Sequence, residues 1–149
     1  MNTETDTATL NDLIEVLNDG KSFYEEAALK VRPDLATIFV RMARTKGAIA
    51  SDLKAQVASS GETPAQSGTF AGAIRKLYAD VRTSLASDAE AEYVAQLEDF
   101  EDRILHSFRK AVENSEDANV RTIAQRHLPD VKRDHDDMRA LKQIQAAHS

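Results

Sequence analysis

The sequence predicts an all-α protein whose main body is an antiparallel four-helix bundle. Apolar residues recur in steps of three and four along most of the 149-residue chain, a spacing typical of amphipathic helices. Five glycines and three prolines are too few for a turn-rich β protein. Aromatic residues make up only 5% of the chain and Trp is absent, so the core should consist mainly of small aliphatic side chains, which suit close helix packing.

The first helix is expected to begin at Thr9, because Asp12 follows three residues later and completes a variant of the capping box. Residues 1–8 are polar and are expected to fray. Arg32 and Pro33 should end this helix, since a residue before proline avoids the α conformation. The bundle-facing stripe consists of Leu10, Leu13, Leu17, Gly20, Tyr24, Ala27 and Val31.

The second helix is expected to run from about Pro33 to Ser59, antiparallel to the first because the connection is short. Residues 59–69 are rich in Ser, Gly and Thr and predict a loop, which a shorter helix over residues 69–86 follows. The stripe of the second helix is Leu35, Phe39, Met42, Lys46, Ile49, Leu53 and Val57. The apolar face of the shorter helix is Phe70, Ile74, Leu77, Val81 and Leu85.

Ser87 and Glu90 form a capping box that should open the third long helix. The polar residues 113–117 separate it from the last helix, which extends to about Ala146 and leaves residues 147–149 frayed. Pro129 lies inside the last helix and should kink it or leave a carbonyl unpaired. The two stripes are Val94, Leu97, Glu101, Ile104, Phe108 and Val112, and then Val120, Ala124, Leu128, Val131, His135, Met138 and Leu141.

The segment between the second and third long helices indicates how the bundle is connected. It is about 28 residues long, and its own helix spans about 25 Å at a rise of about 1.5 Å per residue. The chain can therefore return along the bundle and start the third long helix beside the start of the second. This is the connectivity of ferritin-like bundles with one crossover. Residues 1–149 are expected to form a single domain.

Composition and charge exclude several classes of function. The absence of cysteine excludes disulfides, iron–sulfur clusters, Cys-ligated zinc and thiol catalysis. A formal net charge of −6 disfavours binding to nucleic acid or to an anionic membrane. The N-terminus is polar, and no apolar run approaches the roughly 20 residues that cross a bilayer. We therefore expect a cytoplasmic protein that binds neither nucleic acid nor membrane.

Several segments resemble one family of proteins. Residues 10–20 read LNDLIEVLNDG and residues 23–28 read FYEEAA. Together with residues 101–102 and 131–135, they are similar to a bacterial family of ferritin-like four-helix bundles of uncharacterised function. The resemblance covers the chain from about Thr9 to Leu141. It implies a ferritin-like fold and, by analogy only, a role related to metal or to stress.

The chain matches the ligand pattern of the di-iron members of that superfamily poorly. Those proteins use one Glu from each of two helices and a Glu-x-x-His motif from each of the other two. Glu25 and Glu101 correspond to the single carboxylates, and His135 lies where a histidine ligand belongs. Lys132, however, replaces the Glu of that motif, and the second helix contains no histidine. A complete ferroxidase site cannot be assembled from these residues. Under the leading hypothesis, the protein is therefore not an enzyme.

Lys46, Glu101 and His135 occupy positions on stripes that are otherwise mainly apolar. Gly20 and Lys46 are equally far in sequence from the turn at Pro33, so both should lie roughly 20 Å from that turn. The glycine, which has no side chain, would then face the long side chain of the lysine. Glu101 falls at a similar height. Because an unpaired buried charge is costly, we expect an interior Lys46–Glu101 ion pair with His135 and Glu25 within reach.

The leading hypothesis follows from this ion pair. The ammonium of Lys46 would fill the space that a metal occupies in the di-iron relatives, so the protein would be a non-catalytic bundle without a metal or cofactor. Alternatively, Lys46 extends its charge along the bundle edge into solvent, and His135 is a boundary residue with satisfied hydrogen bonds. The face of the helix over residues 69–86 is expected either to pack on its own bundle or to meet a second subunit in a homodimer.

Two other hypotheses belong to different classes. The protein could be a metal-dependent oxidase or an iron-handling protein that binds iron, manganese or zinc. Its candidate ligands would be Glu25, Glu98, Glu101 and His135. Lys46 argues against this, because it would repel a cation. The third hypothesis is an interaction module in which the interior polar residues only fix helix register. Asp102 and His106, four residues apart, are interpreted as part of a solvated charged face.

Overall fold

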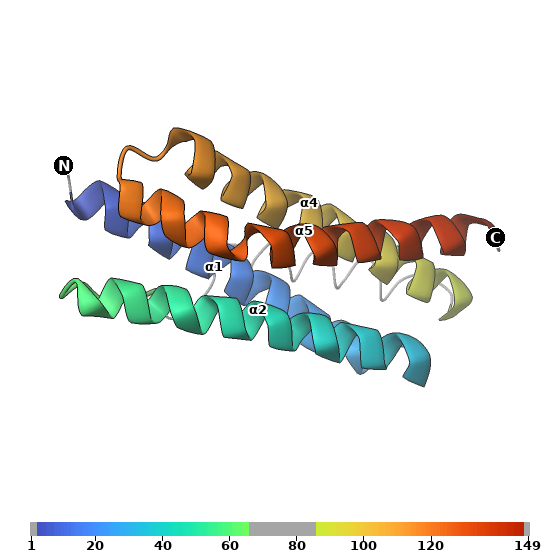
Figure 1. The fold of residues 1–149 in the computed structure, drawn as a ribbon. Coiled ribbons are helices and arrows are strands. Elements are labelled where there is room, and N and C mark those ends of the chain that lie inside the picture. The colour runs from blue at the N-terminus through green and yellow to red at the C-terminus, as the bar shows by residue number, and fades with distance from the viewer. Residues whose placement is uncertain (1–2, 66–85, 148–149) are drawn as a thin grey trace.

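The structure is a computed structural model that describes residues 3–65 and 86–147. Four helices make up most of these residues: α1 (Thr3–Ala28), α2 (Pro33–Ser59), α4 (Ala86–Asn114) and α5 (Ala118–Ala147). The described part of the chain contains no strand. The predicted all-α four-helix bundle is confirmed (Figure 1). Among the described helices, none combines the length and apolarity needed to cross a membrane.

The bundle consists of two helical hairpins packed against each other. The main contacts join α1 to α2 and α4 to α5, and further contacts join α1 to α4 and α2 to α5. Each of these four pairs is antiparallel, so α1 lies diagonally opposite α5 and α2 lies diagonally opposite α4 (Figure 1). This arrangement gives every helix one face that points to a shared axis.

The directions of the helices agree with a bundle that has one crossover. The end of α2 and the start of α4 lie at opposite ends of the bundle (Figure 1). Near the start of α4, the Oε2 atom of Glu90 accepts a hydrogen bond of 2.7 Å from the backbone N–H of Arg32, just before α2. The starts of these two helices are therefore neighbours, as expected. The crossover helix predicted over residues 69–86 precedes α4 and, apart from Ala86, lies outside the described residues.

The second helix has the predicted bounds, whereas the first does not. α1 begins at Thr3, so residues 3–8 are part of the helix and the predicted start at Thr9 is wrong. A Thr-x-x-Asp pattern also occurs inside helices, where it caps nothing. At the other end of the chain, α5 extends to Ala147, the first of the residues expected to fray.

The last helix starts at a side-chain cap and continues through a proline. The Oδ1 atom of Asp117 accepts hydrogen bonds from the backbone N–H groups of Asn119, at 2.6 Å, and Val120, at 3.2 Å. This is the geometry of an N-cap residue. α5 includes Pro129 without interruption. Because proline has no N–H, the carbonyl of Gln125 lacks its usual partner within the helix.

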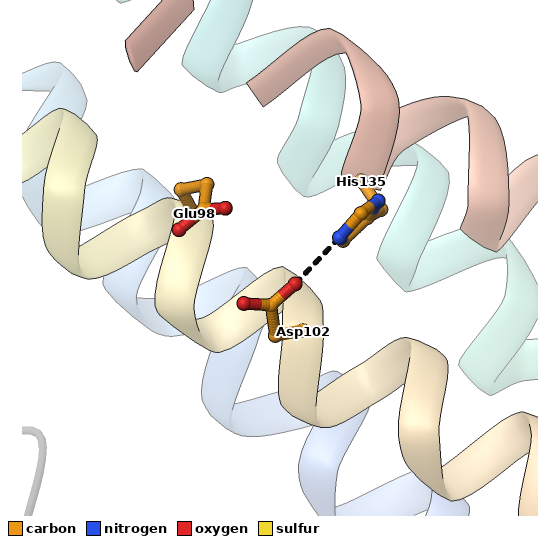
Figure 2. Close-up of side chains that lie close together, drawn as sticks. All are labelled: Glu98, Asp102 and His135. Atoms are coloured by element: carbon orange, nitrogen blue, oxygen red, sulfur yellow. Dashed lines mark hydrogen bonds and ion pairs between the residues drawn. The ribbon is translucent and has the colours of Figure 1, made fainter. Parts of the chain in front are cut away.

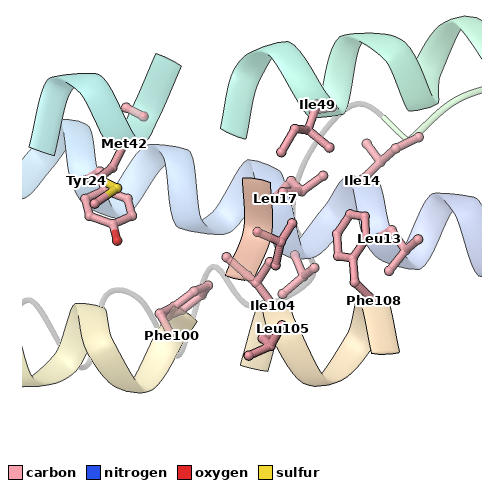
Figure 3. Packing of buried hydrophobic residues seen from close by; sticks show 14 of the residues in the cluster. Leu13, Ile14, Leu17, Tyr24, Met42, Ile49, Phe100, Ile104, Leu105 and Phe108 are labelled. Atoms are coloured by element: carbon pink, nitrogen blue, oxygen red, sulfur yellow. The ribbon is translucent and has the colours of Figure 1, made fainter. Parts of the chain in front are cut away.

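In the described part of the chain, the apolar stripes predicted for α1, α2, α4 and α5 form the core. Phe23 packs against Tyr93 and Phe100 with ring centroids 6.1 and 6.2 Å apart, and Tyr24 packs edge-on against Phe39 at 5.8 Å. Aliphatic residues of α1 and α4 fill the next section of the core (Figure 3). These are Leu13, Ile14, Leu17, Ile104 and Leu105, with Phe108 beside them. Two charged residues, Lys46 and Glu101, are buried on the same stripes.

Candidate functional site

Four polar residues, one from each helix, meet inside the bundle. We call Tyr24, Lys46, Glu101 and Asp134 the interior cluster. The Nζ atom of Lys46 lies 2.6 Å from Oε1 of Glu101 and 3.0 Å from Oδ2 of Asp134. The hydroxyl of Tyr24 donates a hydrogen bond of 2.6 Å to the same Oε1 atom. The exposed fraction of the side chain is 1% for Lys46, 0% for Glu101 and 4% for Asp134, so these ion pairs are inside the protein.

The missing side chain of Gly20 leaves room for the aliphatic part of the Lys46 side chain. Gly20 on α1 lies opposite the lysine, and a Cβ atom added there would lie 3.5 Å from Cδ of Lys46 and 3.1 Å from Cδ1 of Ile104. The ammonium also lies 5.3 Å from the centroid of the Tyr24 ring, a cation–π contact. The predicted pairing of a missing side chain with a long one is therefore present.

The charges of the interior cluster do not balance when Lys46, Glu101 and Asp134 are all ionised. One ammonium faces two carboxylates, which leaves one negative charge in excess. Burial is the main cause that raises the pKa of Glu101, and Asp134 adds to it, while Lys46 and Tyr24 act in the opposite direction. Among the described residues, Oε2 of Glu101 has no hydrogen-bond partner. Burial and the nearby Glu101 also raise the pKa of Tyr24 well above its ordinary value.

The interior cluster does not fit a di-iron site. It offers two carboxylates and one phenol, contains no imidazole, and has an ammonium at its centre. A di-iron centre of this type needs four carboxylates and two histidines. A buried ammonium in contact with both carboxylates also repels any metal cation that approaches them. The chemistry of the cluster is therefore that of a closed ion-pair network.

A second group of polar residues lies beside the interior cluster, between α4 and α5. We call Glu98, Asp102 and His135 the outer triad (Figure 2). Each residue contributes one potential ligand atom, and the three atoms lie within 4.8 Å of one another. The Nε2 atom of His135 lies 2.5 Å from Oδ1 of Asp102. Glu98 and His135 are buried, whereas the side chain of Asp102 is 52% exposed.

The two groups occupy the same turns of their helices. Successive residues of an α-helix point about 100° apart, so when one faces the axis its neighbour faces the adjoining helix. Glu101 and Asp134 point inward, and the residues that follow them, Asp102 and His135, point to the α4–α5 interface. Glu98 precedes Asp102 by one helical turn and shares its face.

Further polar contacts orient the outer triad. The Nδ1 atom of His135 lies 3.0 Å from Oδ1 of Asp136, which also pairs with Lys132 through Oδ2 at 2.8 Å. The hydrogen bond from Lys132 is the main cause that lowers the pKa of Asp136, and the hydrogen bond from His135 lowers it further. On the other side, Nζ of Lys142 lies 3.4 Å from Oε2 of Glu98.

The structure brings some of the predicted site residues together and separates others. Lys46 and Glu101 meet as predicted, and the buried ammonium contradicts the alternative in which Lys46 reaches solvent. His135 is buried, but its hydrogen-bonding partners are Asp102 and Asp136 rather than the interior pair. The members of the predicted metal set are therefore divided: Glu98 and His135 lie in the outer triad, and Glu101 lies in the interior cluster.

The prediction that Glu25 belongs to the interior site is wrong. Its side chain is 56% exposed and forms a surface pair of 3.6 Å with Lys21. The neighbouring Tyr24 takes the inward position on α1, and the next residue is turned by about 100° away from it. Glu25 can therefore be neither a member of the interior cluster nor an interior metal ligand.

Sequence reasoning missed three residues of these two groups. Tyr24 was assigned to the apolar stripe, although a buried tyrosine hydroxyl usually has a partner. Asp134 lies in a run of surface charges, but its spacing of three and four residues from the buried Val131 and Met138 places it on the inner face. Asp102 is half exposed, as the interpretation of a charged face requires, yet one of its oxygens contacts His135.

The fold and the interior cluster define an antiparallel four-helix bundle with a buried ion-pair network. A family model described as "Domain of unknown function (DUF2383)" matches residues 6–114, and the chain belongs to this family. The predicted membership in a family of uncharacterised helical bundles is confirmed.

A solved structure supports the fold. The chain is similar to the crystal structure of a conserved hypothetical protein, rv2844, from Mycobacterium tuberculosis, with a TM-score of 0.71. The two chains are 16% identical, and the similarity covers 95% of this chain and 94% of the other. None of the curated proteins compared with the chain matches it.

Proposed function

We propose that the protein is a non-catalytic member of the ferritin-like bundles, in which a lysine takes the place of the interior metal. The observation that carries this proposal is the ammonium of Lys46, which is buried and lies within 3.0 Å of carboxylate oxygens from Glu101 and Asp134. In a di-iron bundle, carboxylates from facing helices converge on metal ions. Here they converge on an ammonium, which supplies the compensating positive charge without any redox chemistry.

The biological role would then lie in the bundle as a whole and in its surfaces. We propose that it forms a homodimer and acts in the cytoplasm in a stress-related process, as the family resemblance suggests. The interaction-module hypothesis is compatible with the same interior, because a buried ion-pair network also fixes helix register. The oxidase hypothesis is weakened, since Glu25 is on the surface and Glu101 pairs with Lys46.

Metal analysis of matched variants tests the proposal. Because the outer triad could bind metal independently, every sample should carry His135→Ala. Protein purified without chelators is then offered Fe²⁺, Mn²⁺ or Zn²⁺, desalted and measured by elemental analysis. We expect no retained metal with Lys46 present, and up to one ion per chain when Lys46→Ala is added. Near-stoichiometric metal in the protein that keeps Lys46 would contradict the proposal.

Self-association is tested separately. Sedimentation velocity over a hundredfold range of concentration would show a shift from monomer to dimer mass if the protein forms a homodimer. A monomer at every concentration would remove the dimer from the proposal and leave the assignment of the interior cluster unchanged.

A further inference from the structure

We infer that the outer triad of Glu98, Asp102 and His135 is a mononuclear binding site for a divalent transition-metal ion such as zinc. One imidazole nitrogen and two carboxylate oxygens form a donor set that suits zinc, manganese or ferrous iron. This site differs from a di-iron centre in its position, because it lies at the α4–α5 interface and uses none of the residues of the interior cluster.

The separations of the donor atoms are close to those that a metal needs. An ion bound at about 2.0–2.2 Å from each ligand holds its ligands about 3–4 Å from one another. The three donor atoms of the triad already lie within 4.8 Å of one another, and their side chains converge from two helices (Figure 2). A rotation of the half-exposed side chain of Asp102 would widen its contact of 2.5 Å with His135 toward that spacing.

The environment of His135 is an independent observation in favour of a cation. Its side chain is 9% exposed, and its Nδ1 atom lies 3.0 Å from a carboxylate oxygen of Asp136. If Nδ1–H donates to Asp136, Nε2 carries a lone pair that faces Oδ1 of Asp102. A neutral imidazole carries only one N–H, so whichever of the two carboxylates it donates to, its other nitrogen turns a lone pair toward a carboxylate oxygen, a repulsion that a bound metal ion or a second proton on the ring would relieve. A carboxylate behind a histidine is also the usual outer-shell partner of a histidine that binds metal.

The triad reaches solvent through Asp102. Glu98 and His135 are buried, so they would anchor the ion, whereas Asp102 is 52% exposed and opens the site to solvent. Lys142 pairs with Glu98 at 3.4 Å, but its side chain is 51% exposed and can withdraw into water. A metal ion could therefore enter from the surface, and a water molecule could complete its coordination.

The alternative to a metal ion at His135 and Asp102 is a proton on the imidazole ring. His135 would then be an imidazolium held between Asp102 and Asp136, and the triad would be an ion-pair network without affinity for metal. Titration of the metal-free protein with Zn²⁺ in a calorimeter separates the two cases. Co²⁺ serves as a second probe, because its visible absorption reports low-coordinate nitrogen and oxygen ligands.

We expect one Zn²⁺ per chain, with affinity reduced at least about tenfold by His135→Ala and by Asp102→Asn. Asp102 is half exposed, so its replacement should leave the fold intact and keep the test valid if His135→Ala unfolds. Asp136→Asn should weaken binding about 10–100-fold through the orientation of His135. His106→Ala is the matched control, because His106 is an exposed histidine on α4 outside the triad.

Either of two results would overturn the inference. The first is an absence of saturable Zn²⁺ binding, which would leave the imidazolium as the occupant. The second is binding that His135→Ala and Asp102→Asn leave unchanged, which would place the metal elsewhere. Neither result would affect the assignment of Lys46, because the metal analysis of the Lys46 variants is done with the triad disabled.

Discussion

Lys46 is the residue on which the centre of the bundle depends. Removing an ammonium from water costs several kcal/mol, and this cost is offset only if the charge meets well-placed partners. Lys46 has such partners in Glu101 and Asp134, and Tyr24 completes the coordination of the shared Glu101 oxygen. Such a network contributes little net stability compared with a hydrophobic core, but loss of one member leaves the others uncompensated.

Glu101 should make a distinctive contribution to the pH dependence of stability. Its pKa is raised in the folded protein, so the folded state binds a proton more tightly than the unfolded chain does. This contribution to stability is fully present below the ordinary glutamate pKa of about 4.3, and it is lost as the pH rises through the higher, folded pKa. The side chain of Glu101→Gln is neutral at every pH, so the stability of this variant does not include that pH-dependent loss.

Urea unfolding of the parent and of Glu101→Gln tests this expectation. The measurements should cover several pH values from about 4, near the ordinary glutamate pKa, to about 7. The free energy of unfolding of the variant should improve relative to that of the parent as the pH rises. A relative loss over the same range would mean that the folded protein favours the charged form of Glu101.

At the scale of the helices, two glycines allow a matched test of packing. A Cβ at Gly20 would meet Cδ1 of Ile104 at 3.1 Å and Cδ of Lys46 at 3.5 Å, both inside the core. A Cβ at Gly47 on α2 would meet only the flexible end of Lys21, with Cε at 3.2 Å and Cδ at 3.4 Å. Helix propensity favours alanine at both positions by about 0.5–1 kcal/mol.

We therefore expect Gly47→Ala to raise the free energy of unfolding by about 0.5–1 kcal/mol. Gly20→Ala should lower the free energy of unfolding. Displacing Ile104 or Lys46 costs about 1–3 kcal/mol, and the gain in helix propensity offsets only part of this cost. Chemical denaturation of both variants measures the difference. Equal stabilisation by the two substitutions would show that α1 does not need a close approach to α2 and α4 at Gly20.

The start of α5 depends on the cap formed by Asp117. Its carboxylate accepts hydrogen bonds from the N–H groups of Asn119 and Val120, which otherwise have no partner within the helix. Asp117→Ala should lower the free energy of unfolding by about 1 kcal/mol, within a range of about 0.5–2. Asp130→Ala, at a half-buried position in the interior of the same helix, is the comparison and should cost less. An equal loss in both variants would argue against a specific cap.

The sequence was sufficient to predict the four helices that the structure describes, but not all of their ends. The periodic stripes and the Arg32–Pro33 boundary predicted α2 from Pro33 to Ser59 as it occurs. The start of α1 was misplaced because a capping pattern at Thr9 looks the same whether it lies at a helix end or inside a helix. Helix starts depend on which N–H groups lack partners, and sequence spacing alone does not reveal this.

At the scale of the whole molecule, the sequence predicted heights along the bundle better than rotations about the helices. The fixed rise per residue placed Gly20, Lys46 and Glu101 at one level, and the structure joins them there. Whether Tyr24 or Glu25 faces the axis depends on a rotation of about 100°, which a broad apolar stripe leaves undetermined. For the same reason, His135 was expected beside the interior ion pair, where the structure instead has Asp134.

The central claim is that Lys46 is the positive charge that holds Glu101 and Asp134 inside the bundle. The most direct test is the free energy of unfolding of Lys46→Met, compared with the triple variant Lys46→Met, Glu101→Gln, Asp134→Asn. We predict a loss of about 3–5 kcal/mol in the single variant, since it buries two carboxylates without a counter-charge, and recovery of most of that loss in the triple variant. A Lys46→Met protein as stable as the parent, or a triple variant no more stable than the single one, would contradict the account.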